Sequence, residues 1–329
     1  MSENQECSVA GLPADLLVES SHWAADGIIV LDLIDREGRP LPRWSPGAHL
    51  EIQLPSGLIR QYSLCGETDD HRRYRIAILR SPESRGGSEE VHTTQLVGQS
   101  LRVQAVRNHF ELSPAPRYLF IAGGIGITPI LPMVTHCAKS AIPWQLIYSG
   151  RRHDAMAFTS SLSNLTGGKC EYVQTETSPR CDIATLLANV DSGTAVYCCG
   201  PRSLLDAVEQ ATQAMAAPPS LHLERFEGRS EPAAPKDTGD AENAFEVTLA
   251  RTGVTLGVAP DQSILHAVLQ AVPSFLYSCE EGYCGTCEAV VLDGEPDHRD
   301  IVLSPDEQQA GKMMICVSRA CSDKLVLDL

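Results

Sequence analysis

The sequence predicts a multidomain protein: an antiparallel β-barrel, then a parallel α/β domain, then a small α+β domain. Three observations predict it. Short alternating apolar runs fill the first third of the chain, strands and helices alternate in the middle, and a compact cysteine-bearing block closes the sequence. At 329 residues the chain has the length of two or three ordinary domains.

The barrel is predicted over residues 1–112. Its runs GIIVLDL, HLEIQL, YRIAIL and SLRVQAV are separated by Gly and Pro, as in small antiparallel barrels or sandwiches.

The α/β domain is predicted over residues 113–227. There the strands RYLFIAG, PWQLIYSG and TAVYCCG are interspersed with the helices ITPILPMVTHCAKS and SLLDAVEQATQAM, a rhythm typical of parallel sheets.

Residues 228–243 are rich in Pro, Ala, Gly and charge and show no apolar period, which predicts a linker. The last domain, residues 244–329, opens with the strand FEVTLA and contains the short helix ILHAVLQAV. It holds 13 acidic and 5 basic residues, half of the net charge of −16 in about a quarter of the chain.

Composition excludes several classes of function. The negative net charge disfavours nucleic acid as a partner. No apolar run is long enough to span a membrane, and the N-terminus lacks a secretory pattern, so we expect a cytoplasmic protein. With twelve cysteines in such a chain, metal or redox use is a better expectation than a disulfide framework.

Four of the cysteines have the spacing of plant-type [2Fe–2S] ferredoxins. Cys279, Cys284 and Cys287 form C-x4-C-x2-C, and Cys316 follows after 28 residues. Gly282 and Gly285 would let the backbone approach the inorganic sulfurs. The alternatives are a zinc site, which usually shows paired C-x2-C units, and coincidence in a cysteine-rich chain. Cys321 lies outside the pattern and is expected to be a packed thiol.

A glycine-rich turn follows the strand RYLFIAG. Such a turn at the start of a helix can bind a pyrophosphate through backbone N–H groups, with a threonine hydroxyl as a further donor and a proline in the first helical turn. The residues are Gly123, Gly124, Gly126, Thr128 and Pro129. Tight packing of a strand on a helix also requires glycine, so the turn alone is weak evidence.

Another strand, TAVYCCG, ends at Cys199, Gly200 and Pro201. Ligands bind at the carboxyl ends of parallel strands, where the small polarisable thiol of Cys199 could abut a nicotinamide ring. The alternative is a buried cysteine that acts as a small hydrophobic residue.

The barrel contains a short strand that combines a cation, an aromatic ring and a hydroxyl. Arg60 could pair with a phosphate, Tyr62 stack on a flavin, and Ser63 approach the flavin edge from the opposite face of the strand. Gly86, Gly87 and Ser88 form a second anion-binding loop. The alternative is a surface strand followed by a glycine turn.

Together these segments resemble the phthalate dioxygenase reductase family over nearly the whole chain. The resemblance is carried by RQYSL, YRIAILR, RGGS, AGGIGITP, YCCGP, CEEGYCGTC and HRDIVLSPDE…MICVSRA…LVLDL, in the order flavin barrel, NAD domain, β-grasp ferredoxin domain. It implies FMN rather than FAD, and NADH. The implied FMN contacts are Arg60, Gln61, Tyr62, Ser63, the backbone of Ala77, Ile78 and Leu79, the loop Gly86, Gly87 and Ser88, and Phe226, for which a core position is the alternative.

The resemblance also implies a function. NADH gives two electrons as a hydride, whereas an iron–sulfur cluster accepts one at a time, so a flavin must stand between them. Ser63 near flavin N5 and Cys199 at the nicotinamide are the candidate catalytic residues. The expected electron acceptor is the terminal Rieske-type oxygenase of a two-component aromatic hydroxylating or demethylating system. We expect this oxygenase to bind the acidic surface of the ferredoxin domain transiently.

Three points stay open in the sequence. The acceptor could be a cytochrome P450 instead, or the chain could be a non-catalytic redox sensor or adaptor. Arg151 and Arg152 follow the second strand of the α/β domain, where they could bind the 2′-phosphate of NADPH or lie on a solvated face.

Overall fold

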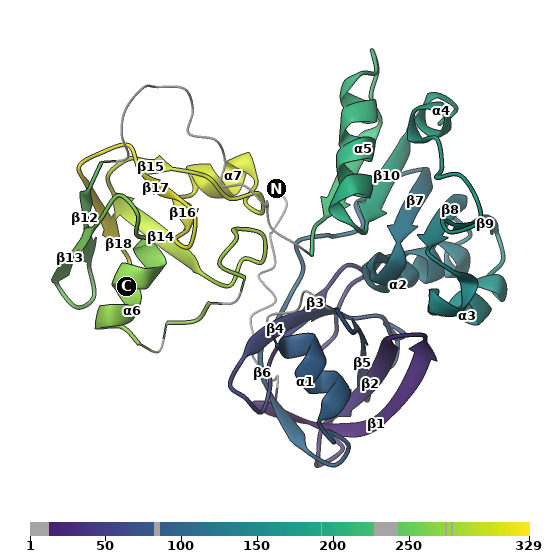
Figure 1. Ribbon diagram of the computed structural model, residues 1–329, viewed down its shortest axis with the longest axis horizontal. Coiled ribbons are helices and arrows are strands. Elements are labelled where there is room, and N and C mark those ends of the chain that lie inside the picture. Colours follow the sequence, from purple (N-terminus) through teal and green to yellow (C-terminus); the bar gives the residue numbers. More distant parts are fainter. Residues whose placement is uncertain (1–12, 82–85, 192, 227–242, 274, 278) are drawn as a thin grey trace. The chain divides into compact units, whose positions relative to one another are not determined.

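The computed structural model describes residues 13–81, 86–191, 193–226, 243–273, 275–277 and 279–329 (Figure 1). The chain divides into two compact units, Met1–Arg225 and Phe226–Leu329. The predicted linker, apart from residue 243, lies outside the described residues.

The first unit begins with a six-stranded antiparallel sheet in the order β4-β3-β6-β1-β2-β5. Its elements are β1 (Asp15–Ala25), β2 (Ile28–Ile34), β3 (His49–Gln53), β4 (Ile59–Ser63), β5 (Arg73–Leu79), the helix α1 (Gly87–Thr93) and β6 (Ser100–Arg107). A bridge between Leu64 and Ile76 joins the two outer strands and closes the sheet into a barrel. Alternate apolar side chains, such as Leu31, Leu50 and Ile76, fill the interior.

A parallel five-stranded sheet follows, in the order β11-β10-β7-β8-β9. Its strands are β7 (Arg117–Gly123), β8 (Trp144–Gly150), β9 (Gly168–Gln174), β10 (Thr194–Cys199) and β11 (Ser220–Glu224). Its helices are the short 3-10 turns η1 (Gly124–Gly126) and η2 (His153–Ala155), and α2 (Ile127–Lys139), α3 (Thr159–Ser163), α4 (Ile183–Ala188) and α5 (Arg202–Gln213).

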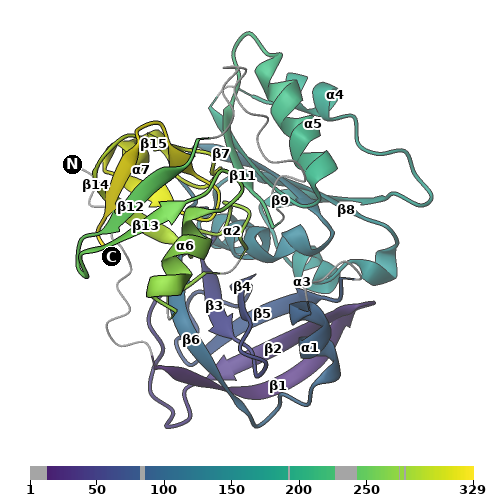
Figure 2. The ribbon, with the colours of Figure 1, turned by 60° about the vertical axis from the view of Figure 1, so that its left-hand side comes forward.

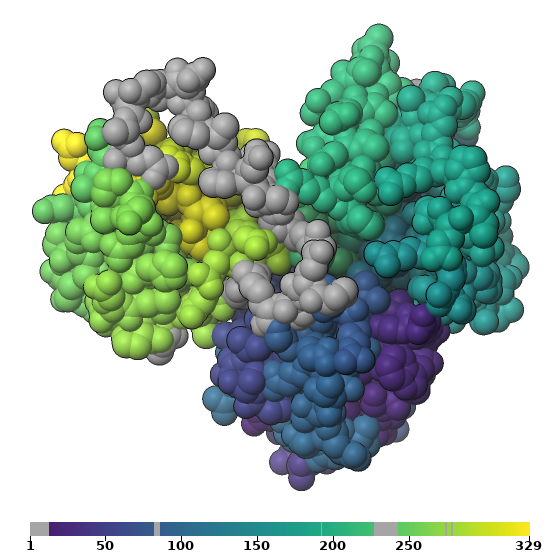
Figure 3. Space-filling view, viewed as in Figure 1, coloured from purple at the N-terminus to yellow at the C-terminus, as the bar shows by residue number. Residues whose placement is uncertain are grey.

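Helices cover both faces of this sheet (Figures 1 and 2). One face packs on α4 and α5 through Ile121, Val196, Leu187 and Leu205, while α2 contacts β7, β8 and β10. Barrel atoms and α/β atoms meet directly within the first unit (Figure 3), and the ion pair between Lys139 of α2 and Glu67 joins them.

The second unit has a mixed sheet in the order β13-β12-β18-β14-β16. Its elements are β12 (Phe245–Leu249), β13 (Val254–Val258), α6 (Ile264–Ala271), β14 (Glu288–Asp293), β15 (Pro296–Asp297), α7 (Pro305–Gln309), β16 (Lys312–Met314), β17 (Arg319–Ala320) and β18 (Lys324–Leu327). The first and last strands, β12 and β18, run parallel at the centre. Ile264, Leu265 and Val268 of α6 are buried in the core of the unit, as in a β-grasp domain.

The three predicted fold types are confirmed. The predicted helices correspond to α2, α5 and α6, and the predicted strands to β2, β3, β5, β6, β7, β8, β10 and β12. The helices α1, α3 and α4 were not predicted, because five to seven residues make fewer than two helical turns and show little 3.6-residue period. The strand β9, GKCEYVQ, was not predicted because it lacks a run of apolar residues. Within the described residues, no helix is both long and apolar enough to cross a membrane.

Candidate functional site

The four predicted cluster ligands lie in the second unit. Cys279, Cys284 and Cys287 belong to the loop between α6 and β14, and Cys316 follows β16. All four are buried, with exposed fractions between 2% and 7%. The loop is strongly curved, since Glu280, Gly282 and Gly285 all have positive φ.

The fold brings these thiols together although 28 residues separate Cys287 from Cys316 in the chain. Cys284 interacts with Cys279, which raises the pKa of Cys284, and burial raises it further. Cys279 and Cys287 are both side-chain neighbours of Cys316. Two thiols from the loop thus flank the fourth, so the predicted quartet is one cluster of side chains.

Backbone N–H groups of the loop point at the sulfur atoms. The N–H of Glu281 donates to Sγ of Cys279 at 3.3 Å, and the Tyr283 and Gly282 backbones act in the same way on Cys279 and Cys316. Each of these donors lowers the pKa of its thiol, although a neighbouring thiol and burial raise the net pKa of Cys279 and of Cys316. Cysteine sulfurs with amide donors directed at them suit cluster ligation, and the residues present therefore fit a [2Fe–2S] group.

Two further observations bear on the cysteines. No three His, Cys, Asp or Glu side chains of the described residues are arranged to hold a single metal ion. Cys321 is exposed, so the expectation of a packed thiol was wrong. It follows the two-residue strand β17, whose pairing leaves the next side chain at the surface.

In the first unit, the predicted glycine turn packs on the end of β10. A Cβ on Gly126 would overlap the carbonyl oxygen of Cys199, and one on Gly200 would lie 2.9 Å from Cα of Gly123. The Pro201 side chain also packs against Gly123. Close packing therefore requires glycine at Gly123, Gly126 and Gly200, and packing is the alternative to phosphate binding given above. Gly124 has a φ of 55° and open space around it, so packing does not require glycine there.

Thr128 and Pro129 are buried in the first turn of α2. The Thr128 hydroxyl donates to the carbonyl of Ile125 at 2.9 Å. Its hydrogen is used within the turn, so the hydroxyl stabilises the start of the helix. The backbone N–H groups of η1 are the donors that can still face a pyrophosphate.

Cys199 lies beside a carboxyl group. Glu224 of β11 is its register partner, and both end their strands at the carboxyl edge of the sheet. Oε2 of Glu224 is buried and has no hydrogen-bond partner in the described part of the chain, although the residue as a whole is only partly buried. Burial raises the pKa of Glu224 to about 8, and burial with the neighbouring carboxyl raises the pKa of Cys199 well above its usual range. Both groups are therefore uncharged at neutral pH.

The predicted flavin residues lie on β4, on β5 and at the start of α1. A Cβ on Gly87 would lie 2.5 Å from Nε of Arg60, which places the Arg60 side chain against the predicted anion loop. Ser63 is buried, and its Oγ has no hydrogen-bond partner among the described residues. A buried hydroxyl without a partner is the kind of atom that a bound flavin would satisfy.

Other residues of the predicted flavin site have partners already. Gln61 donates to Oε2 of Glu51 at 3.2 Å, and the Ser81 N–H donates to Oγ of Ser88 at 3.2 Å. Burial raises the pKa of Tyr62, so its phenol stays neutral. Gly86 begins α1 with φ of 87°.

The backbone groups of β5 point alternately toward β2 and away from it at the predicted positions. The N–H of Arg80 donates to the carbonyl oxygen of Gly27. Because backbone groups alternate along a strand, those of Ile78 point toward β2 and those of Ala77 and Leu79 point away from it. The carbonyl of Ile78 also bonds the His92 ring at 3.0 Å. β5 contacts η1, so the predicted flavin strand and the nucleotide turn are neighbours. The positions of Ser63 near flavin N5 and of Cys199 at the nicotinamide stay predictions.

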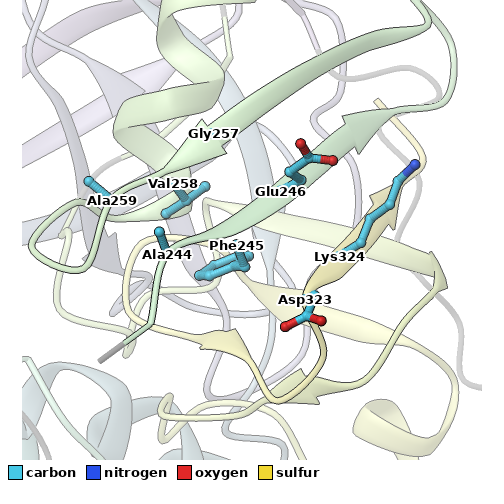
Figure 4. A pocket seen from close by; sticks show the side chains of 8 residues that line it. All are labelled: Ala244, Phe245, Glu246, Gly257, Val258, Ala259, Asp323 and Lys324. Atoms are coloured by element: carbon cyan, nitrogen blue, oxygen red, sulfur yellow. The ribbon is translucent and has the colours of Figure 1, made fainter. Parts of the chain in front are cut away.

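Two features lie outside this arrangement. Phe226 is half-buried and is the first residue of the second unit, so its predicted contact with FMN stays untested. A surface pocket of the second unit lies between β12, β13 and β18 (Figure 4). None of the predicted site residues lines it. The pocket is lined by Ala244, Phe245, Glu246, Gly257, Val258, Ala259, Asp323 and Lys324.

Comparison with known proteins identifies a domain family, relatives and similar structures. Residues 247–321 match the 2Fe-2S iron-sulfur cluster binding domain. The chain is 41% identical to the putative toluene-4-sulfonate monooxygenase system reductase subunit of Comamonas testosteroni, over 93% of this chain and 95% of that protein.

Two solved structures are similar over the whole chain. Phthalate dioxygenase reductase, described as a modular structure for electron transfer from pyridine nucleotides to [2Fe-2S], is 33% identical with a TM-score of 0.68, covering 97% of this chain and 98% of that one. An intact type IV self-sufficient cytochrome P450 monooxygenase is 42% identical with a TM-score of 0.86. The match covers 96% of this chain but only 41% of that longer protein.

Proposed function

The chain belongs to the phthalate dioxygenase reductase family, and we propose that it is the NADH-dependent reductase component of a two-component Rieske-type oxygenase system. The family gives a flavin barrel, a nucleotide domain and a [2Fe–2S] domain that transfer electrons. The observation that carries the proposal for this chain is the buried quartet of cysteines with backbone N–H groups aimed at their sulfurs, in a chain that also has a nucleotide turn.

The residues of the first unit would bind and orient two rings. Arg60 and Gly87 would hold the FMN phosphate, Ala77 and Leu79 would bond the edge of the ring through their backbone, and Ser63 would donate to its N5 side. When bound, FMN supplies the conversion of a two-electron hydride into single electrons.

The end of β10 would hold the nicotinamide. Cys199 presents an uncharged thiol, and Glu224 a carboxyl group that burial keeps protonated near pH 7. Two neighbouring groups without charge would disfavour ionic side reactions at the ring. Glu224 was not among the predicted site residues, because its role depends on burial beside Cys199, which only the parallel pairing of β10 and β11 creates.

The electron acceptor would be a separate oxygenase. Relatives are reductase subunits of oxygenase systems, and the acidic residues of the ferredoxin domain suit a partner with a basic patch. A brief, small contact would allow one reductase to serve many turnovers. Cytoplasmic location is part of the same proposal, since the described cysteines form no disulfide.

A cytochrome P450 is the second candidate acceptor. It is favoured by one observation: the 42% identical match in which a domain set like this one is part of a single chain with a P450.

An anaerobic NADH titration followed by visible absorption tests the proposal. Flavin and iron–sulfur bands should both bleach, with two electrons per NADH. Stopped-flow mixing of the reduced protein with a Rieske oxygenase or with a P450 then separates the two acceptors. Absence of both bands after reconstitution with FMN, iron and sulfide would overturn the cofactor assignment and favour the non-catalytic adaptor.

A further inference from the structure

Arg152 is held by two carboxylates at the carboxyl end of β8. Its Nε donates to Oδ1 of Asp154 at 2.9 Å, and its Nη2 donates to Oδ2 of Asp154 at 3.1 Å and to Oδ2 of Asp26 at 2.8 Å. The three side chains are exposed, at 48% for Arg152, 64% for Asp154 and 67% for Asp26. A bidentate pair with a second acid is a small ionic network rather than a single surface pair.

The backbone holds this network in place. Asp26 lies in the turn between β1 and β2 of the barrel, and its N–H donates to the carbonyl of Asp154 at 2.8 Å. The hydrogen bond of Asp154 and then the charges of both acids raise the pKa of Arg152, with a smaller effect from Glu176. Two protein segments far apart in sequence therefore converge on one guanidinium.

The position of the network is informative. β8 is the neighbour of β7, the strand that leads into the glycine turn. In α/β dinucleotide sites the loop after the strand next to the phosphate-binding turn meets the adenosine ribose, where an arginine accepts a 2′-phosphate and an acid accepts the 2′-hydroxyl. Here the arginine is present, but its Nε and Nη2 already donate to carboxylates.

We propose that Asp26 and Asp154 select NADH against NADPH by occupying Arg152. The inference rests on the proposed nucleotide function and goes beyond it by naming residues that decide between the two nucleotides. A 2′-phosphate dianion would meet a guanidinium whose Nε and Nη2 already donate to carboxylates, and two negative charges would lie beside it. A 2′-hydroxyl would meet acceptors instead. The selection is made partly by the barrel, through the hairpin that carries Asp26.

The test compares the wild-type holoenzyme with the variant Asp26→Asn/Asp154→Asn and the same variant carrying Arg152→Ala. Ferricyanide reduction gives kcat/KM for NADH and NADPH. Binding of 2′,5′-ADP and 5′-ADP, measured by calorimetry, gives a readout that does not require hydride transfer. Asp191→Asn is the matched control, because Asp191 pairs with Arg117 at the amino ends of the strands, on the opposite edge of the sheet.

We expect the wild-type protein to favour NADH. The double variant should gain about tenfold in kcat/KM for NADPH and in affinity for 2′,5′-ADP, and Arg152→Ala should remove the gain. The control should leave both ratios unchanged. A double variant without any gain, or a gain that survives Arg152→Ala, would overturn the inference. If no nucleotide is oxidised by any variant, the proposed function fails, while the 2′,5′-ADP affinities still decide the role of Arg152.

Discussion

Glu224 and Cys199 end adjacent parallel strands in register, so that a carboxyl group without a hydrogen-bond partner among the described residues lies beside a buried thiol at the carboxyl edge of the sheet. Burial raises the pKa of Glu224 to about 8. Burial also raises the pKa of Cys199, and the neighbouring Glu224 carboxyl adds to that rise.

Glu224 should make stability depend on pH. Burial raises its pKa from 4.5 to about 8 in the folded protein, so the stabilisation from the bound proton is complete below about pH 4.5 and is lost as pH rises through about 8. The variant Glu224→Gln, which keeps the shape without the ionisation, should flatten this dependence. Urea midpoints at pH 5, 6.5 and 8 measure it.

The exposed Glu171 of β9 offers a matched control for that measurement, and Glu171→Gln should keep the wild-type slope. A Glu224→Gln variant with the full wild-type slope would show that the carboxyl is ionised throughout this range.

Cys284→Ser should abolish the iron–sulfur cluster. A hydroxyl replaces one of four thiolates that two irons require, so acid-labile sulfide and the cluster absorption should fall to background. Flavin content and NADH-dependent ferricyanide reduction should persist, because the first unit has its own core. Cys321→Ser, at an exposed position outside the quartet, is the control and should keep its iron. Retention of the cluster in Cys284→Ser would remove Cys284 from the ligand set.

Ser63→Ala separates binding from stability. Its Oγ is buried without a partner among the described residues, so removing it should leave the flavin-free protein equally stable or more stable by about 1 kcal/mol. Hydride transfer to FMN should slow by roughly 10²-fold, as for loss of one aimed donor. Stopped-flow reduction of the FMN-loaded protein by NADH measures the rate of hydride transfer. Thermal unfolding of the flavin-free protein measures the change in stability. Ser161→Ala, at an exposed position, should change neither, and an unchanged rate in Ser63→Ala would exclude the N5 role.

Gly126→Ala should damage the nucleotide turn. The added Cβ would overlap the backbone carbonyl of Cys199, and because backbone cannot move aside cheaply, we expect a loss of about 1–3 kcal/mol in stability together with weaker NADH binding. Unfolding midpoints and KM for NADH measure these effects. Gly257→Ala is the control, since it has open space and no positive φ. Wild-type behaviour of Gly126→Ala would mean that the two strand ends are further apart than described.

Much of the organisation could be read without a structure. Long elements with a clear period, such as α2 and β7, were predicted within a residue or two, because burial of one face imposes a pattern on the chain. Three of the cluster ligands fall within nine residues, so their spacing alone reveals the shape of the loop. Arg60 and Ser63 were recognised as a candidate site because alternation on a single strand fixes which faces they occupy.

The sequence by itself determined the fold classes, the cysteine quartet and the glycine turn, because each shows as a local pattern or as a characteristic spacing in the chain. Only the tertiary structure decided which buried groups lack a hydrogen-bond partner among the described residues and which charged side chains are held in ion pairs. Among the described residues the buried Ser63 hydroxyl has no partner, Thr128 uses its hydroxyl inside the turn, and Arg152 is held by an acid from the barrel. These properties depend on burial and on contacts between distant segments, which no local pattern records.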